Sequence, residues 1–333
     1  MSVRTTMADV ARESSVSLMT VSRVINGKAD VSEETRQRVL EVIDRLEYRP
    51  SGIARSLATR RTGTLGLVVP DISNPFFSDV ARGVTTEAYR EDYNVFLCSS
   101  EEDGQRELDL LHSLEEKRID GLILCSSRLN DDVLSAVLAR FPSTVLVNRR
   151  SRNPQVGTVL ADDESGARLL MAHLLRDGRR SIGFLAGPPM SHSGSARLRG
   201  YQAALAVAGL PCEDALVQPC APVVSGGLAA AQALLAAQPQ ISALFCYNDL
   251  AAVGALQACV RLGRRVPDDV AVAGFDDIPL AALVTPALTT CRVPRYELGV
   301  RATKVLLTQI DGRPGECCEA VVPVEMVVRA SAP

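Results

Sequence analysis

The sequence predicts a multidomain chain in which a small all-α head precedes a two-lobed α/β core with parallel sheets. Two patterns support this fold class. Near the N-terminus, apolar residues recur at helical spacing in three short stretches. From Thr64 onward, short apolar runs alternate with amphipathic stretches of roughly 12 to 18 residues. At 333 residues, 47% of them hydrophobic, the chain can form roughly two domains and a small appendage.

Each helix predicted in the head begins at a hydroxyl side chain. Thr6 can cap the first helix, with Asp9 completing a capping box, whereas Ser17 and Ser32 can cap the second and third. A core this small suits a binding module of about forty residues. The positions expected to face that core are Val10, Ala11, Val21, Val24, Val39, Val42, Ile43 and Leu46.

Charge is divided unevenly along the chain. Residues 1–62 carry 11 Lys and Arg against 8 Asp and Glu, although the whole chain has a net charge of −3. Pro50 ends the head, and the following SGIARSLATRRTGT contains three arginines and no acidic residue. Its helical signal is only one or two turns long, so we expect it to fold against a partner.

The core is predicted from seven apolar runs, most of them followed by a helical pattern, which is typical of parallel sheets with helical crossovers. Seven exceed what one open sheet comfortably holds, so we expect two lobes that change over near residues 160–164. Ligands bind at the carboxyl ends of such strands, where polar segments such as PDISNPFF and GPPMSHSGSAR occur. The runs are TLGLVVP, YNVFLCSS, DGLILCSS, STVLVNR, RSIGFLAG, SALFCYND and DVAVAGFDD.

The stretch ADVARESSVSLMTVSRV fits a helix-turn-helix, with Ala11, Val16 and Val21 at inward positions. The alternative is an ordinary small helical hairpin. The basic segment that follows the head favours DNA binding.

Other classes of protein are disfavoured. The nine cysteines form no CxxC, and most lie in apolar runs, which predicts buried thiols in a reducing cytosol. No signal peptide and no run of about 18 apolar residues occurs, so we expect a soluble, cytoplasmic, nucleoid-associated protein without membrane contact. With three histidines and no phosphate loop, GxSxG or HExxH, we expect no metal, no cofactor and no catalytic residues.

Two runs near the N-terminus, MADVARESSVSLMTVSRVINGKADVSEETRQRVLEVIDRLEYRP and IARSLATRRTGTLGLVVPDISNPFF, resemble the LacI/GalR (lactose-repressor) family of bacterial transcriptional regulators. Later blocks resemble the periplasmic-binding-protein-like core of the same family, in the family's order. These include GPPMSHSGSARLRGY, FCYNDLAAVGAL and RVPDDVAVAGFDD. The resemblance covers essentially the whole chain.

The resemblance implies that residues 17–24 form a recognition helix in the major groove. Leu18, Met19 and Arg23 would read bases, and Thr20 and Ser22 would face phosphates. Arg23 can donate two hydrogen bonds to guanine, whereas Leu18 and Met19 can pack on thymine methyls. The remaining residues implied to contact DNA are Thr6, Ser17, Asn26, Ser32, Tyr48, Ala54 and Leu57.

Residues 51–58 match the family's hinge helix, in which Leu57 would wedge into the minor groove. The bland alternative is a leucine in a flexible linker. Two departures concern local backbone cost. The turn between the first two helices reads Ser14-Ser15 where the family has glycine, and the hinge contains Ser51-Gly52. A serine at positive φ, or a glycine inside a helix, costs roughly 1 kcal/mol.

The resemblance also implies an effector cleft between the lobes. A carboxylate and a guanidinium suit vicinal hydroxyls, and a phenylalanine suits the C–H face of a sugar. Considered one at a time, these residues also have structural interpretations. Asn248 is typical of a helix cap and Phe77 of a core residue. Asp277 is typical of a solvated loop and His192 of a solvent-facing loop residue. Ala221 replaces an aromatic found in some relatives, which disfavours a purine. The implied residues are Asn74, Phe76, Phe77, Asn148, Ser193, Arg197, Asn248 and Asp276.

We therefore expect a homodimeric repressor of a pseudo-palindromic DNA operator, controlled by a small sugar-like effector. The rival classes are a solute-binding receptor and a sugar-processing enzyme with the same two-lobed core. The predicted domains are a head (1–48), a hinge (49–62) and a core (63–333). Within the core, one lobe comprises 63–161 and 292–323, and the other comprises 162–291 and 324–333.

Overall fold

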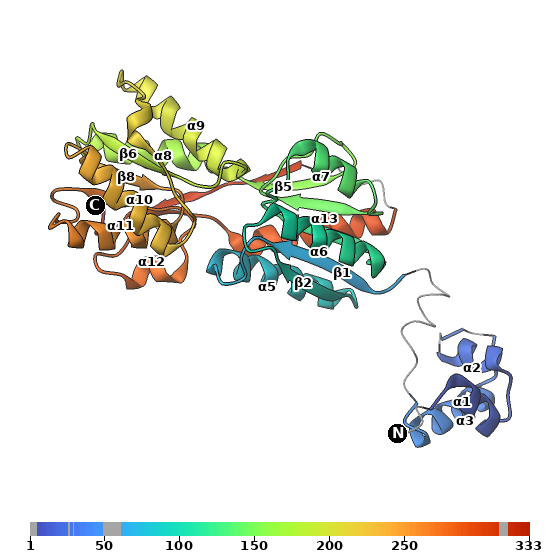
Figure 1. Cartoon of the computed structure of the whole chain (residues 1–333). Helices are drawn as coiled ribbons and strands as arrows, with labels where there is room; N and C mark the ends of the chain where they lie inside the picture. Colours follow the sequence, from blue (N-terminus) through green and yellow to red (C-terminus); the bar gives the residue numbers. More distant parts are fainter. Residues whose placement is uncertain (1–4, 26, 29, 49–60, 313–318) are drawn as a thin grey trace. The chain divides into compact units, whose positions relative to one another are not determined.

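The chain forms two compact units, Met1–Thr62 and Gly63–Pro333 (Figure 1). The computed structural model describes residues 5–25, 27–28, 30–48, 61–312 and 319–333. Within these ranges, no helix combines the length and apolar character needed to cross a membrane.

The head contains three helices, α1 (Met7–Glu13), α2 (Leu18–Ile25) and α3 (Glu33–Arg45). The three predicted caps are confirmed. Thr6 and Asp9 form a capping box, the Ser17 hydroxyl accepts from the Thr20 N–H at 3.1 Å, and Ser32 caps α3. The predicted inward residues pack into one small core, of which Val10, Ala11, Val21, Val24, Val39 and Val42 are buried, and Ile43 and Leu46 are partly buried.

The turn between α1 and α2 has the strained backbone that its sequence predicts. Ser15 has φ 52°, in the left-handed region that favours glycine. The preceding Ser14 is buried and donates its hydroxyl hydrogen to the Val10 carbonyl oxygen at 2.6 Å. Ser14 therefore stabilises this turn through a side-chain hydrogen bond, whereas Ser15 adopts the strained backbone conformation.

The first lobe of the core is a six-stranded, all-parallel sheet between two helical layers. One layer, α5 (Pro75–Arg90) and α13 (Arg295–Ile310), packs on the side chains of Leu65 and Leu67. The other, α6 (Gly104–Glu116) and α7 (Asp131–Leu138), packs on Val68 and Leu122. The strand order is β11 (Glu319–Val322), β5 (Gly157–Ala161), β4 (Thr144–Val147), β3 (Gly121–Cys125), β1 (Thr64–Val69) and β2 (Asn94–Ser99).

The second lobe repeats this plan with four parallel strands (Figure 1). Helices α8 (Asp163–Arg176) and α9 (His192–Val207) pack on Phe184 and Phe245, whereas α10 (Val224–Ala237) and α11 (Asp249–Arg261) pack on Leu185 and Leu244. The strand order is β7 (Val217–Pro219), β6 (Ile182–Ala186), β8 (Ala243–Cys246) and β9 (Ala271–Ala273).

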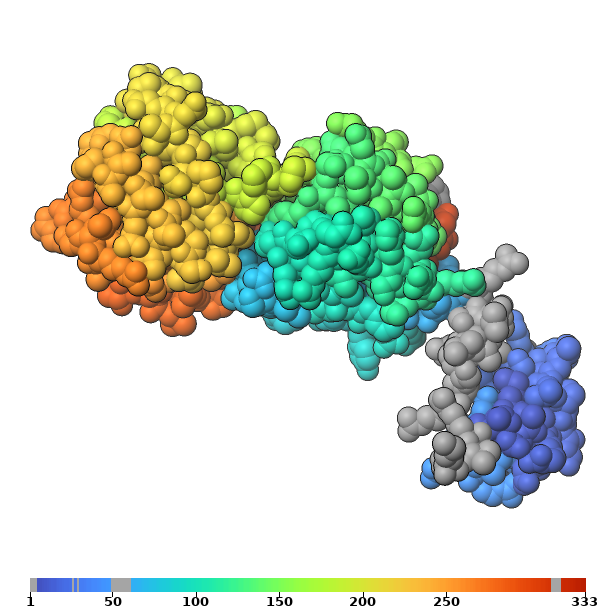
Figure 2. All heavy atoms as spheres, in the orientation of Figure 1, coloured from blue at the N-terminus to red at the C-terminus, as the bar shows by residue number. Residues whose placement is uncertain are grey.

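Three connections join the lobes, at β5–α8, at β10–α13 and at β11–β12. A short 3₁₀ turn (Asp214–Leu216) and helix α12 (Pro279–Leu283) complete the second lobe. Strands β10 (Thr290–Arg292) and β12 (Glu325–Val327) pair antiparallel beside it. In the view of Figure 2 the surface of the core narrows between its two lobes.

All seven predicted strands are present, so the predicted fold class is confirmed. Five more strands, β5, β7, β10, β11 and β12, were not predicted because most are only three or four residues long. The exact limits of head, hinge and lobes stay a prediction. Seven cysteines within the described ranges are free thiols, and of these Cys212 is exposed, contrary to the expected burial, and Cys98 is half-buried.

Candidate functional site

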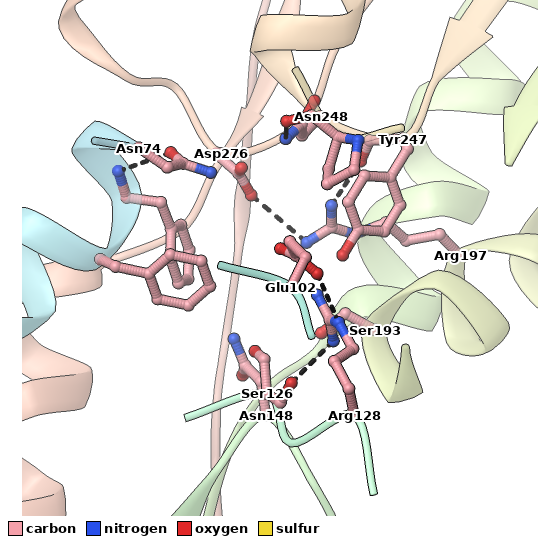
Figure 3. A pocket seen from close by; sticks show the side chains of 13 residues that line it. Asn74, Glu102, Ser126, Arg128, Asn148, Ser193, Arg197, Tyr247, Asn248 and Asp276 are labelled. Atoms are coloured by element: carbon pink, nitrogen blue, oxygen red, sulfur yellow. Dashed lines mark hydrogen bonds and ion pairs between the residues drawn. The ribbon is translucent and has the colours of Figure 1, made fainter. Parts of the chain in front are cut away.

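One pocket brings together side chains from both lobes of the core (Figure 3). Its empty space is about 330 Å³ when the open solvent at its mouth is counted, and about 20 Å³ of it can hold a water-sized molecule. All eight residues that the sequence places in the effector cleft line it, and five others line it as well. The lining residues are Asn74, Phe76, Phe77, Glu102, Ser126, Arg128, Asn148, Ser193, Arg197, Pro222, Tyr247, Asn248 and Asp276.

The pocket forms where the carboxyl ends of the two sheets face each other. Asn74 follows β1, Asn148 follows β4, Asn248 follows β8 and Asp276 follows β9. The parallel strands of one sheet all end at the same edge, so side chains far apart in the sequence meet there. The sheet topology therefore explains why these residues converge.

Arg197 is the central cation of the pocket and is only 3% exposed. Its guanidinium donates to Asp163 at 2.9 Å, to the Tyr247 carbonyl oxygen at 2.5 Å and to Asp276 at 3.3 Å. It also lies 3.8 Å from the centre of the Phe275 ring. Although burial opposes the charged form, Asp163 and Asp276 hold the pKa of Arg197 above its ordinary value, so the side chain stays charged.

Asp276 is the acidic partner of Arg197 on the pocket wall and has φ 113°, a conformation that few residues other than glycine adopt. Burial raises the pKa of Asp276 to about 7, although Arg197 pulls it in the opposite direction. The carboxyl group can therefore change its ionisation near neutral pH.

The three asparagines on the pocket wall also form hydrogen bonds that stabilise the fold. Asn74 caps α5 by accepting from the Phe76 N–H, and Asn248 caps α11 by accepting from the Ala251 N–H at 2.8 Å. Asn148 accepts from the Ala161 N–H at 3.0 Å. The capping role read from the sequence for Asn248 is thus confirmed, and it does not exclude a ligand contact.

Ser193 contributes a buried hydroxyl that lacks a hydrogen-bond partner within the described residues. A buried, unpaired hydroxyl costs roughly 1–3 kcal/mol, so such atoms are rare in folded proteins. Because Ser193 lines the pocket, a polar group of a ligand can supply the missing partner.

The sequence interpretation did not assign Glu102, Ser126, Arg128, Pro222 or Tyr247 to the pocket. Arg128 is buried and donates to Glu102 at 2.5 Å and to the Ser126 carbonyl oxygen at 2.7 Å. Glu102 follows β2, Arg128 follows β3 and Tyr247 follows β8. Their positions just after strand ends are therefore the sequence signal that indicates these residues.

Asp277 and His192 differ in their surroundings from what the sequence predicts. Asp277 is no solvated loop residue: its half-buried carboxylate accepts from Arg292 at 2.8 Å and from Arg329 at 2.6 Å. Burial alone would raise the pKa of Asp277, but these two hydrogen bonds outweigh it and hold the pKa below its ordinary value. His192 is half-buried at the start of α9 and lines a separate pocket with Arg150 and Arg199.

The exposed face of α2 carries the residues predicted to read bases. Leu18 and Met19 are 53% and 64% exposed, whereas Val21 and Val24 on the opposite face are buried. Arg23 is exposed and forms an ion pair with Asp30 at 3.3 Å. Exposed pairs of this kind contribute little stability, so Arg23 can exchange Asp30 for another partner.

The other residues predicted to contact DNA fall into four groups. Thr6, Ser17 and Ser32 are exposed at helix starts, and Thr20 and Ser22 are half-buried on α2. Tyr48 is only 6% exposed and packs in the core of the head, so its main role is structural and its predicted contact with DNA stays a prediction. Asn26, Ala54 and Leu57 lie outside the described residues.

A helical head with an exposed second helix, followed by a two-lobed core with a polar pocket between its sheets, is typical of ligand-responsive DNA-binding proteins. Residues 6–51 match the bacterial regulatory proteins of the lacI family. Residues 62–323 match the periplasmic binding proteins and sugar binding domain of the LacI family. The chain therefore belongs to the LacI family and is a transcriptional regulator.

Individual relatives agree with this assignment. The chain is 36% identical to the ribose operon repressor of Halalkalibacterium halodurans, over 98% of this chain and 96% of that one. It resembles a solved complex of the transcriptional regulator CelR with cellobiose (TM-score 0.75, 33% identity, 98% and 100% coverage). It also resembles a Lac repressor dimer bound to operator and the anti-inducer ONPF (TM-score 0.89, 26% identity, 99% coverage of both chains).

Proposed function

We propose that the protein is a homodimeric repressor that binds a pseudo-palindromic operator and releases or retains it according to a small ligand in the core pocket. The observation that carries the DNA-binding role is the exposed apolar pair Leu18 and Met19 on α2. Large apolar side chains at the start of a helix whose other face is buried suit contact with thymine methyls in the major groove.

The chemistry of the pocket favours an uncharged ligand with several hydroxyl groups. Arg197 faces Asp276, and Arg128 faces Glu102, so each cation already has an acidic partner. Such pairs offer donors and acceptors side by side, which suits neighbouring hydroxyls of a sugar. The Ser193 hydroxyl, which has no hydrogen-bond partner in the described part of the chain, offers a further polar contact.

A dimer is supported by the similarity of the chain to a Lac repressor that was solved as a dimer bound to its operator. Twofold symmetry would present two copies of α2 to half-sites about one helical turn apart.

The two rival functions are not favoured. A solute-binding receptor has no use for the helical head, and the pocket side chains are accounted for as binding groups, so we propose no catalytic role. A regulator of transcription acts on chromosomal DNA, which supports a location in the cytoplasm at the nucleoid. The hinge role of residues 49–62 and the wedge role of Leu57 stay predictions from the sequence.

Footprinting of the full-length protein on the DNA upstream of its own gene tests the operator. We expect two protected half-sites separated by about one helical turn. Absence of protection at low salt, with and without sugars, would refute the proposed role as an operator-binding regulator.

A thermal-shift screen tests the pocket, with D-ribose and cellobiose as first probes followed by other sugars, sugar acids and nucleosides. We expect Asp276→Ala to abolish the shift caused by any neutral sugar that stabilises the wild type. An unchanged shift would place the ligand elsewhere.

A further inference from the structure

Arg295, at the first position of α13, connects the two walls of the pocket. Its Nη1 donates to the carbonyl oxygens of Asp276 at 2.5 Å and Asp277 at 2.7 Å. Its Nε donates to the carboxylate of Asp79 at 3.0 Å, and its Nη2 lies 3.0 Å from the same oxygen. The Arg295 side chain is only 12% exposed. One guanidinium thus joins Asp79 to two adjacent carbonyl oxygens that lie far from it in the sequence.

The two ends of this connection belong to opposite lobes. Asp276 follows β9 of the second lobe, and its carboxylate meets Arg197 in the pocket. Asp79 lies on α5 of the first lobe, whose first turn supplies Phe76 and Phe77 to the same pocket. A change in the angle between the lobes must therefore stretch or rebuild the hydrogen bonds of Arg295.

The backbone that Arg295 holds is costly to maintain. Asp276 has φ 113° and Asp277 has φ 54°, and residues with a side chain keep such conformations only where the surrounding structure imposes them. Arg295 binds both carbonyl oxygens, while Arg292 and Arg329 bind the Asp277 carboxylate. These contacts fix the direction in which the Asp276 side chain leaves the backbone.

The other end of the connection is equally constrained. Asp79 also accepts from Arg82 at 3.0 Å, and the Arg82 guanidinium lies 5.0 Å from the centre of the Tyr296 ring on α13. Helices α5 and α13 approach closely, since a Cβ added at Gly83 would lie 2.2 Å from the Tyr296 carbonyl oxygen. Arg295 is therefore anchored to a rigid helix pair.

We propose that Arg295 is a positioning residue for the pocket, which orients Asp276 toward Arg197 and couples that orientation to α5 on the facing lobe. The role needs an arginine, because only a planar guanidinium can donate in several fixed directions at once. Only the role of this coupling in regulation rests on the proposed function. The orientation of the Asp276 side chain by Arg295 does not depend on it.

The test follows the ionisation of Asp276 in the full-length protein. The charged groups around its carboxyl are Arg197 from α9, Asp163 from α8, Asp249 from α11 and Arg295 from α13. The free energy of unfolding by urea, followed by circular dichroism at fixed protein concentration, is measured from pH 5 to 8. Subtracting the profile of Asp276→Asn leaves the pH-dependent part of the free energy of unfolding that Asp276 contributes. The slope of this part changes where folded Asp276 ionises, and the pH at half of that change is the midpoint of the step.

We expect Arg295→Met to move the midpoint of this step upward by about half a pH unit or more, because Asp276 loses both a nearby cation and its orientation toward Arg197. In an Asp276→Asn background, Arg295→Met should leave the pH profile unchanged. Arg295→Lys keeps the positive charge but lacks the planar guanidinium that donates in several directions, so it should also move the midpoint. Arg301→Gln, which removes an exposed pair with Glu297 on the same helix, is the control and should behave as wild type.

Three results would overturn the positioning role. The first is a wild-type midpoint in Arg295→Met. The second is a wild-type midpoint in Arg295→Lys, which would show that only the charge of Arg295 matters. The third is a change in the pH profile on Arg295→Met that persists in the Asp276→Asn background. None of these depends on DNA or on a ligand. Failure of operator binding would refute the proposed function and leave this result unaffected.

Discussion

Asp276 combines a strained backbone, deep burial and a partner cation, so its ionisation affects the stability of the protein. Burial raises its pKa to about 7 in the folded chain, whereas an unfolded aspartate ionises near its ordinary value of about 4. Between these values the folded state holds a proton that the unfolded state has lost. The stability from this group is complete below about pH 4 and is lost as the pH rises through about 7.

We predict that Asp276→Asn flattens the pH dependence of stability between pH 5 and 7. The contribution removed is at most about 1.4 kcal/mol per pH unit, the value for one proton. Urea unfolding across this range measures it. Asp277→Asn is the matched control, because the pKa of Asp277 is lowered and its carboxylate is ionised in both states. Equal slopes for wild type and Asp276→Asn would show that Asp276 ionises normally.

A second prediction at this scale concerns α2. Leu18→Ala and Met19→Ala should each weaken specific operator binding by roughly five- to tenfold, because each removes an apolar contact worth about 1 kcal/mol. Affinity for unrelated DNA should change little, since phosphate contacts dominate it. Both side chains are exposed, so thermal stability should stay at the wild-type value. Equal losses on both DNAs would exclude base reading by these residues.

The sequence predicted single residues best where one pattern determined them. Thr6 and Asp9 form the expected capping box because such a box depends on a local spacing of three residues. The ion pairs of Asp277 with Arg292 and Arg329 depend on tertiary geometry. Local sequence does not reveal them, so the sequence alone predicts a solvated residue at Asp277.

Among the elements, the packing of α5 against α13 ties the pocket wall to the connections between the lobes. Gly299 matches Gly83 in this contact, since a Cβ added there would lie 2.2 Å from the Val80 carbonyl oxygen. Backbone atoms cannot move aside as a flexible side chain can. The helices therefore approach each other only where both residues lack a side chain.

We predict that Gly83→Ala destabilises the protein by about 2–3 kcal/mol, because the added methyl group forces the two helices apart. Gly104→Ala at the start of α6 is the control, since its Cβ would come no closer than 3.6 Å to its neighbours. Urea unfolding compares the two variants. Equal stabilities would mean that α5 and α13 separate without cost.

The alternation of apolar runs and helical patterns predicted the order of the main elements, and the rule that ligands lie at strand ends predicted the edge of the sheets that forms the pocket. Strands such as β10 and β12 escaped prediction because three residues in antiparallel pairing carry no periodic signal. Tyr247 was missed although it directly precedes Asn248 at a strand end.

At the scale of the whole molecule, regulation requires that the pocket and the head influence each other. A ligand can shift DNA affinity only by the difference in its own affinity for the two states, typically about 1–3 kcal/mol. The pocket lies between the two lobes, which are joined by three connections. Sequence and structure therefore agree on a regulator, while the identity of the ligand depends on side-chain geometry that the sequence alone does not specify.

The most direct measurement is a fluorescence-anisotropy titration of the full-length protein on two duplexes of equal length at about 0.15 M salt. One duplex carries the footprinted upstream site, and the other carries the same bases in scrambled order. We predict that the protein binds the site at least about 10³-fold more tightly. Equal affinity for the two duplexes would contradict a sequence-specific regulator.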